Sequence, residues 1–211
     1  MDSTRLWIMS CPHYGIVKMR YVEARDSGRV RIKCCAGKGG ARSGKMALRL
    51  EIFSLQNCSG CDLMRRKTLS HPDVLKEIQS KWDLYQEEDA FAGDRHFLWY
   101  PINFARDPEG KILRIEEGFI PAYEFMVFLR LAEAQYLIQR HEYEASWTLL
   151  ENTRENYPAS GLIPECLYYL GVVAHLNDNP RATAKVWRVL RERYKDSAWA
   201  HKVMLQWPPI T

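Results

Sequence analysis

In the first half of this 211-residue chain, the hydrophobic pattern alternates between one typical of strands and one typical of helices. Residues 48–55 are mostly apolar, which predicts a buried strand. A helical spacing of apolar residues follows, and its members are Leu63, Met64 and Leu69. Another helix is predicted from Pro72, because a capping residue precedes this proline and an acid follows it.

The strand pattern returns at residues 81–86, 97–105 and 112–115. A turn signal at residues 107–110 predicts that the last two runs form an antiparallel hairpin. Pro101 lies inside the second run. A proline there indicates either the start of a strand or a special turn.

From about residue 122 the pattern is helical to the end of the chain. The expected helices begin near Ala122, Tyr143, Pro164, Arg181 and Ala198. The pattern also repeats at an offset of 37 residues, because Tyr157-Pro158-Ala159-Ser160 recurs as Tyr194-Lys195-Asp196-Ser197. Under this offset Ala134 maps to Gly171, Ser146 to Thr183 and Leu150 to Trp187. We therefore expect small residues where paired helices approach closely and large ones between them.

The composition, with 46% hydrophobic and 27% charged residues, is that of a globular protein. No apolar run approaches the roughly 18 residues of a membrane span, so no membrane association is predicted. The apolar stretch at residues 6–9 is too short for a secretory signal. These features predict a cytoplasmic protein.

Charge is concentrated at the amino-terminal end. Residues 1–45 hold ten Lys/Arg and three Asp/Glu, whereas the whole chain holds 30 and 26. With four glycines in residues 37–44, this segment is expected to be a basic, flexible extension, or to precede a true start at Met46. Such a segment could bind nucleic acid without sequence preference, but a solvated extension is the simpler interpretation, and no nucleic-acid partner is predicted. The acidic run 87–89 is likewise expected to be solvated.

A near match to a phosphate-binding loop lies in the same segment. Gly39 to Lys45 reads G-x-x-x-x-G-K, but Met46 follows where the motif needs Ser or Thr. A strand also follows where the motif needs a helix. Nucleotide binding is therefore set aside, and no cofactor is predicted.

Candidate chemistry lies at Cys58 and Cys61, which form a C-x-x-C motif between the first strand and its helix. The free N–H groups and dipole of a helix start stabilise a thiolate there. Cys58, at the loop end, is predicted to attack a disulfide, and Cys61, one turn inside, to resolve the mixed disulfide. Arg65 and Arg66 would add positive charge nearby.

Two alternatives to redox chemistry stay open for this pair. A structural zinc site normally needs four ligands, and the chain has no second C-x-x-C. An inert pair of thiols is the other alternative. We predict redox chemistry and no metal, because a C-x-x-C in a reducing compartment is more often catalytic.

Together, the C-x-x-C, the strand-start proline and the hairpin in residues 47–135 resemble bacterial thioredoxin-like proteins that carry a helical-repeat tail. The resemblance implies an α/β thioredoxin-like fold, a central mixed sheet with flanking helices. It also implies that Pro101 is cis beside the cysteines, and that the backbone of Tyr100 and Pro101 binds the substrate strand.

The motif departs from thioredoxin in three ways. Asn57-Cys58-Ser59-Gly60-Cys61 stands where thioredoxin has Trp-Cys-Gly-Pro-Cys. Gly60 would loosen the helix start, and Asn57 removes an aromatic flank. Ile52 stands where the family has a buried carboxylate that helps to deprotonate the resolving thiol, so slow turnover is expected.

The helical region is similar to tetratricopeptide repeats, although its period is longer. Three parts are therefore expected: an extension over 1–45, a thioredoxin-like domain over 46–135, and an all-α region of tetratricopeptide-like helical hairpins over 122–211. The helix from Ala122 would be shared, with no flexible linker between Gly118 and Tyr143.

Two functions follow from this sequence. The first is a thiol–disulfide oxidoreductase whose repeats recruit protein clients carrying disulfides or thiols, and which is recycled by a dithiol reductant or a reductase. The second is a protein-interaction scaffold with the same fold, in which the cysteines are idle.

Overall fold

The computed structural model describes residues 6–11, 15–20, 23–26, 29–33, 47–88 and 97–206, with only the backbone described before residue 47 and from residue 204. The chain divides into two compact units, Met1–Ala122 and Tyr123–Thr211. Each unit is described by itself.

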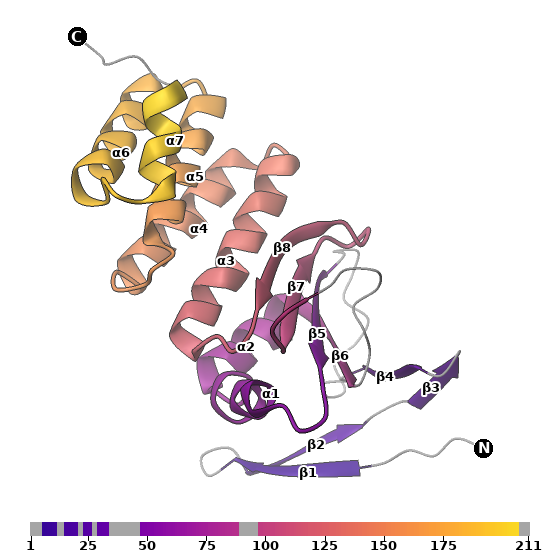
Figure 1. The fold of residues 1–211 in the computed structure, drawn as a ribbon. Helices are drawn as coiled ribbons and strands as arrows, with labels where there is room; N and C mark the ends of the chain where they lie inside the picture. Colours follow the sequence, from indigo (N-terminus) through magenta and orange to yellow (C-terminus); the bar gives the residue numbers. More distant parts are fainter. Residues whose placement is uncertain are drawn as a thin grey trace. The chain divides into compact units, whose positions relative to one another are not determined.

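The first unit contains a mixed sheet with strand order β3-β4-β6-β5-β7-β8 (Figure 1). Its strands are β3 Glu23–Asp26, β4 Arg29–Lys33, β5 Leu48–Ser54, β6 Trp82–Glu88, β7 Ile102–Arg106 and β8 Ile112–Glu117. Only β5 and β6 pair in parallel, and the other neighbours are antiparallel. The predicted mixed sheet is confirmed.

Helices connect the two parallel strands, because parallel neighbours need a crossover. The chain passes from β5 through α1 Ser59–Leu63, the π-helical turn η1 Met64–Thr68 and α2 Pro72–Lys81 to β6. His71 caps α2 through its ring nitrogen, and Pro72 lies in the first turn, as predicted. Met64 and Leu69 are buried, but Leu63 is 39% exposed, so the prediction that Leu63 is buried is wrong. Cys61 and Met64 set the buried face, and Leu63 lies off it.

The predicted hairpin is confirmed. Pro101 directly precedes β7, and the turn between β7 and β8 is closed by Gly110 N donating to Asp107 O at 3.0 Å. The Asp107 carboxylate also accepts from Lys111 N at 2.7 Å. β7 is buried along most of its length, with Ile102 and Ala105 fully covered. This strand therefore forms the centre of the first unit's core.

Four segments within residues 1–45 form strands, which corrects the expectation of a flexible extension. β1 Leu6–Cys11 and β2 Gly15–Arg20 form a separate antiparallel pair. β4 pairs with β6, aligning Ile32 with Gln86. The sequence Arg29-Val30-Arg31-Ile32-Lys33 alternates charged and apolar residues, a strand period that the high charge density obscured.

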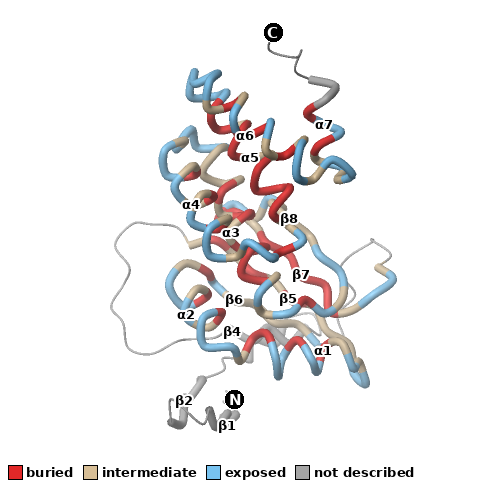
Figure 2. Tube along the Cα trace, turned by 90° about the vertical axis from the view of Figure 1, so that its left-hand side faces the viewer, coloured by how far each residue is buried: buried red, intermediate tan, exposed pale blue. Residues whose placement is uncertain are grey.

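The described part of the second unit is all helical, as predicted. It comprises α3 Ala122–Gln139, α4 Tyr143–Asn156, α5 Ile163–Leu176, α6 Pro180–Arg193 and α7 Ala198–Gln206. Nine of the 14 residues of α5 are buried (Figure 2). The shared core draws on every helix and includes Leu131, Leu150, Leu167, Leu170, Leu190 and Val203.

In each helical hairpin a small residue lies where the paired helices approach closely, as expected. Ser146 on α4 is buried and donates to Ala134 O on α3 at 3.2 Å. In the second hairpin, a β-carbon at Gly171 would lie 1.9 Å from Trp187 Nε1. The same indole nitrogen donates to Tyr168 O at 3.1 Å. Only glycine fits where this indole crosses α5.

Among the described residues, no helix is both long enough and apolar enough to cross a membrane.

Candidate functional site

The loop from β5 to α1 holds the C-x-x-C motif. Asn57 has a positive φ of 57°, a conformation that asparagine tolerates better than most residues. The chain then turns into α1, with Cys58 as its N-cap. Cys58 and Cys61 are joined by a disulfide, with Cα atoms 5.3 Å apart. Cys58 is partly exposed and Cys61 is 2% exposed, the asymmetry expected of an attacking and a resolving sulfur.

The helix start contacts the outer sulfur directly. Cys61 N donates to Cys58 Sγ at 3.1 Å, within the first turn of α1. In the reduced protein the same N–H would stabilise a Cys58 thiolate, because N–H groups at a helix start have no partner within the helix. The local backbone therefore favours Cys58 as the nucleophile.

Positive charge near the motif is weaker than the sequence indicated. Arg65 lies 3.6 Å from Asp62 and 3.6 Å from Glu88, so two carboxylates offset its charge. Arg66 donates to the backbone oxygen of Asp62 at 3.4 Å. Among the described residues, neither guanidinium pairs with a sulfur atom, whereas the helix start donates directly to Cys58 Sγ.

The predicted substrate-binding residues lie beside the cysteines. The Tyr100–Pro101 peptide bond is cis. Tyr100 O lies 3.7 Å from Cys58 Sγ. A β-carbon at Gly60 would lie 2.9 Å from the same oxygen and 3.7 Å from Pro101 Cδ. The structure thus brings Cys58 and Cys61 together with Tyr100 and Pro101, although Cys58 and Tyr100 are 42 residues apart in sequence.

An exposed apolar pair precedes this proline. Leu98 is 84% exposed and Trp99 is 71% exposed. Their backbone N–H groups both donate to Glu117 Oε2 on β8, at 3.2 and 3.3 Å. The sequence did not point to this surface, because residues 97–105 form one strand-like run, in which Pro101 indicated a strand start or a special turn. The strand begins at Ile102, directly after this proline.

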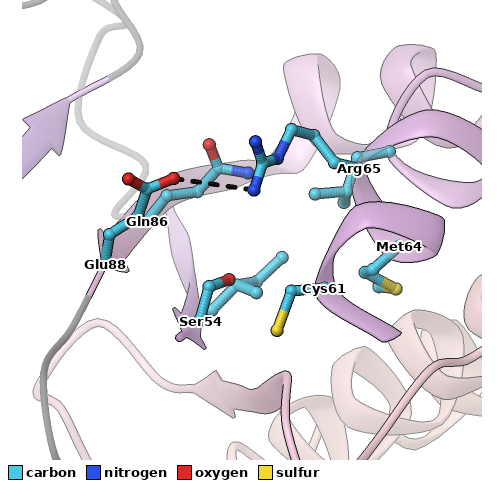
Figure 3. Close-up of a pocket in the computed structure, with 8 residues that line it drawn as sticks. Ser54, Cys61, Met64, Arg65, Gln86 and Glu88 are labelled. Carbon is cyan, nitrogen blue, oxygen red and sulfur yellow. Dashed lines mark ion pairs between the residues drawn. The ribbon is translucent and has the colours of Figure 1, made fainter. Parts of the chain in front are cut away.

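A small cavity lies on the inner side of Cys61. Its volume is about 30 Å³, and Figure 3 shows the sheet residues on one side and α1 on the other. Its lining comprises Ile52, Ser54, Cys61, Met64, Arg65, Leu69, Gln86 and Glu88. Glu88 belongs to the acidic run that was expected to be solvated. In the structure it ends β6 and pairs in register with Ser54, and its side chain is 57% exposed, in line with that expectation.

No cluster of three or more His, Cys, Asp or Glu side chains in the described part of the chain could hold a metal ion. Cys166 is a buried thiol on α5 and forms no disulfide with another described cysteine. The side chains of Cys11, Cys34 and Cys35, and the Gly39–Lys45 motif, lie outside the described residues.

The second unit has a larger groove, of about 570 Å³. Side chains of α4, α5 and α6 line it, and those of both charge signs include Glu151, Glu155 and Lys185. Trp147 and Val189 supply apolar surface. A groove of this size and mixed polarity is suited to a peptide segment or a small molecule.

Comparison with known proteins gives no assignment: no protein-family model matches the chain, and no curated protein sequence matches it.

Proposed function

We propose that this protein is a thiol–disulfide oxidoreductase with a thioredoxin-like first unit, and that Cys58 and Cys61 carry the reaction. The observation that carries the proposal is the pairing of a partly exposed Cys58 at a helix N-cap with a buried Cys61. Supporting it, β5, the C-x-x-C helix, β6, Pro101 and the β7–β8 hairpin follow one another in the order that the resemblance implied.

The reaction would proceed in two exchanges. The Cys58 thiolate attacks one sulfur of a client disulfide, forming a Cys58–client disulfide and releasing the other client sulfur as a thiolate. Cys61, after losing its proton, then attacks Cys58 Sγ. The Cys58–Cys61 disulfide forms, the second client thiolate leaves, and both client thiolates take up protons. The client disulfide gains two electrons and the dithiol loses two.

A further reaction must restore the dithiol. A dithiol reductant or a reductase would reduce the Cys58–Cys61 disulfide by the same exchange chemistry. This cycle suits a reducing compartment, and we propose the cytoplasm as its setting.

The exposed backbone near Tyr100 would hold the client strand. Tyr100 O already lies 3.7 Å from Cys58 Sγ, so a strand aligned along residues 98–100 would bring its disulfide to the attacking sulfur. Leu98 and Trp99 would add apolar contacts, because both side chains are mostly exposed.

We propose that the helical unit is a tetratricopeptide-like module that recruits clients. The 37-residue offset, which maps Ala134 to Gly171 and Leu150 to Trp187, together with small residues at both helix contacts supports a repeated hairpin. The groove lined by α4, α5 and α6 is the surface with the size to hold a client segment.

Insulin reduction in the presence of a dithiol reductant tests the catalytic proposal. The wild-type protein should accelerate reduction, and Cys58→Ser should abolish the acceleration. A Cys61→Ser variant should instead accumulate mixed disulfides with protein clients, because the second exchange is blocked. Trapping should weaken when Lys185→Glu is added in the groove, if the helical unit recruits clients. Equal rates for wild type and Cys58→Ser would contradict the catalytic proposal.

One observation favours the scaffold as a second candidate. The positive charge of Arg65 is offset by Asp62 and Glu88. Among the described residues, the motif therefore has no unpaired cation beside Cys58. In a scaffold, Cys58→Ser and Cys61→Ser would leave partner binding unchanged and neither would trap a client. A pull-down with both variants distinguishes the two functions.

A further inference from the structure

The second exchange poses a problem of proton removal. Cys61 is 2% exposed, and it must lose a proton before it can attack Cys58. Burial in apolar surroundings disfavours a thiolate. Ile52, on the strand beneath it, is 2% exposed and supplies no base.

The cavity beside Cys61 offers a route for that proton. A water molecule needs roughly 10–15 Å³ of such space and two or more polar partners. The cavity of about 30 Å³ meets the size requirement, and Ser54, Gln86 and Glu88 supply polar atoms. It is therefore large enough and polar enough to hold ordered water next to the buried thiol.

Strand register explains why these side chains meet. β5 and β6 run parallel and align Ile52 with Gln86, and Ser54 with Glu88. Alternate residues of a strand share one face, so these four side chains form a patch on a single face of the sheet. Cys61 and Met64 also line the cavity, from the helical side (Figure 3).

Charged groups stand only at one end of this lining. Glu88 on β6 and Arg65 on η1 form an ion pair at 3.6 Å, with side-chain exposures of 57% and 48%. The other lining residues from β5 and β6 are uncharged, and Asp62, next to Cys61 on α1, pairs with Arg65. The cavity thus joins a buried thiol to a carboxylate that is open to solvent.

We propose that Glu88 accepts the proton of Cys61 through water in this cavity, while Arg65 holds the carboxylate at the cavity mouth. The inference rests on the proposed oxidoreductase function. The Cys61 S–H bond breaks, the proton passes through water to the Glu88 carboxylate and then to solvent, and the thiolate attacks Cys58 Sγ. Glu88 does not touch the reacting sulfurs and acts only through the water in the cavity, so we class it as a positioning residue and not as a catalytic one.

Stopped-flow reaction of the reduced protein with dithiobis-nitrobenzoate tests this step directly. The other four cysteines are first replaced, Cys166 by Ala and the rest by Ser. The first release of nitrothiobenzoate depends on reagent concentration and reports attack by Cys58. The second release is independent of reagent concentration and reports attack by Cys61. Both rates are measured from about pH 5 to 9, the range in which carboxylates are mostly ionised and thiols begin to ionise.

Glu88→Gln should slow the second release at least about tenfold below pH 7, a low value for a lost general base. The difference should shrink towards pH 9, where hydroxide removes the proton. Glu88→Asp should restore part of the rate. Glu87→Gln is the matched control, because its side chain lies on the opposite face of β6. Ser54→Val, which replaces a polar cavity wall by an apolar one, should slow the same step.

The outcomes separate the two proposals. If wild type shows no second release, the oxidoreductase function fails and this inference fails with it. If wild type shows the second release and Glu88→Gln matches it at every pH while remaining folded by thermal unfolding, only the proton route is overturned. A slowing that is the same at every pH also overturns it, because a merely structural effect has no such pH dependence.

Discussion

A β-carbon at Gly60 would lie 2.9 Å from the carbonyl oxygen of Tyr100. This close approach joins the start of α1 to the segment before β7. It also explains how Tyr100 O comes to lie 3.7 Å from Cys58 Sγ. The glycine in Cys58-Ser59-Gly60-Cys61 is thus required by tertiary packing.

Gly60→Ala should destabilise the first unit by about 1–3 kcal/mol, because the contact is with backbone and the chain must shift to relieve it. Thermal unfolding should show a lower midpoint, by roughly 2–4 °C per kcal/mol. Gly161→Ala is the matched control, since a β-carbon there meets nothing within 4 Å. Equal midpoints for the two variants would show that the segment before β7 is not held against α1.

Cys58 should alkylate faster than Cys61 after reduction. It is partly exposed and its sulfur receives a helix N–H at 3.1 Å, whereas Cys61 is 2% exposed. Both features should stabilise the Cys58 thiolate, so labelling of Cys58 should begin at a lower pH than that of an ordinary thiol, whose pKa is about 8.5. Iodoacetamide labelling across pH with mass mapping gives the two rates. Faster labelling at Cys61 would reverse the assigned roles.

Glu117→Gln should weaken the binding of the client, which should appear as a higher KM for client reduction. The Glu117 carboxylate accepts from Leu98 N and Trp99 N, and a neutral amide holds these donors less strongly. A loss of about 1 kcal/mol corresponds to a rise in KM of about fivefold. Insulin reduction measures KM, with Glu116→Gln as the neighbouring control. The reaction with a small disulfide should change little. An effect of the same size on that reaction would show that Glu117 acts on the thiol–disulfide exchange and not on client binding.

Gly171→Ala should destabilise the helical unit by about 1–3 kcal/mol, because the added methyl group meets the Trp187 indole. The 37-residue offset indicates a second substitution that should reduce this loss of stability. Ala134 and Leu150 occupy the equivalent places in the first hairpin, so Gly171→Ala combined with Trp187→Leu should lose less stability than the separate changes together. A double-mutant cycle by chemical denaturation measures the coupling. Additive losses would show that the two hairpins do not pack equivalently.

Short-range patterns predicted much of this structure. The apolar run of β5, the cap at His71 and the turn after Asp107 each depend on neighbours in sequence, and all are found. The four predicted site residues also lie together. Their sequence signals, a C-x-x-C and a proline in a strand-like run, were strong enough to place them.

Contacts between distant segments were harder to predict. Gly60 looked like a loosened helix start, because the sequence does not reveal that Tyr100 O lies against it. Glu88 is exposed, as expected of a solvated charge, but the sequence does not reveal that it also lines the cavity beside Cys61, because that depends on the register of two strands. Leu63 fitted a helical face by spacing, but the actual face is set by Cys61 and Met64.

The pairing of β4 with β6 has a consequence for shorter forms of the chain. In the six-stranded order β3-β4-β6-β5-β7-β8, β6 is an interior strand. A product that starts at Met46 would lack β3 and β4 and would leave β6 at the rim of the sheet. Unpaired backbone groups on such a rim invite another chain to add a strand, the usual route to edge-to-edge aggregation. We therefore expect a fragment that begins at Met46 to self-associate more readily than the full chain.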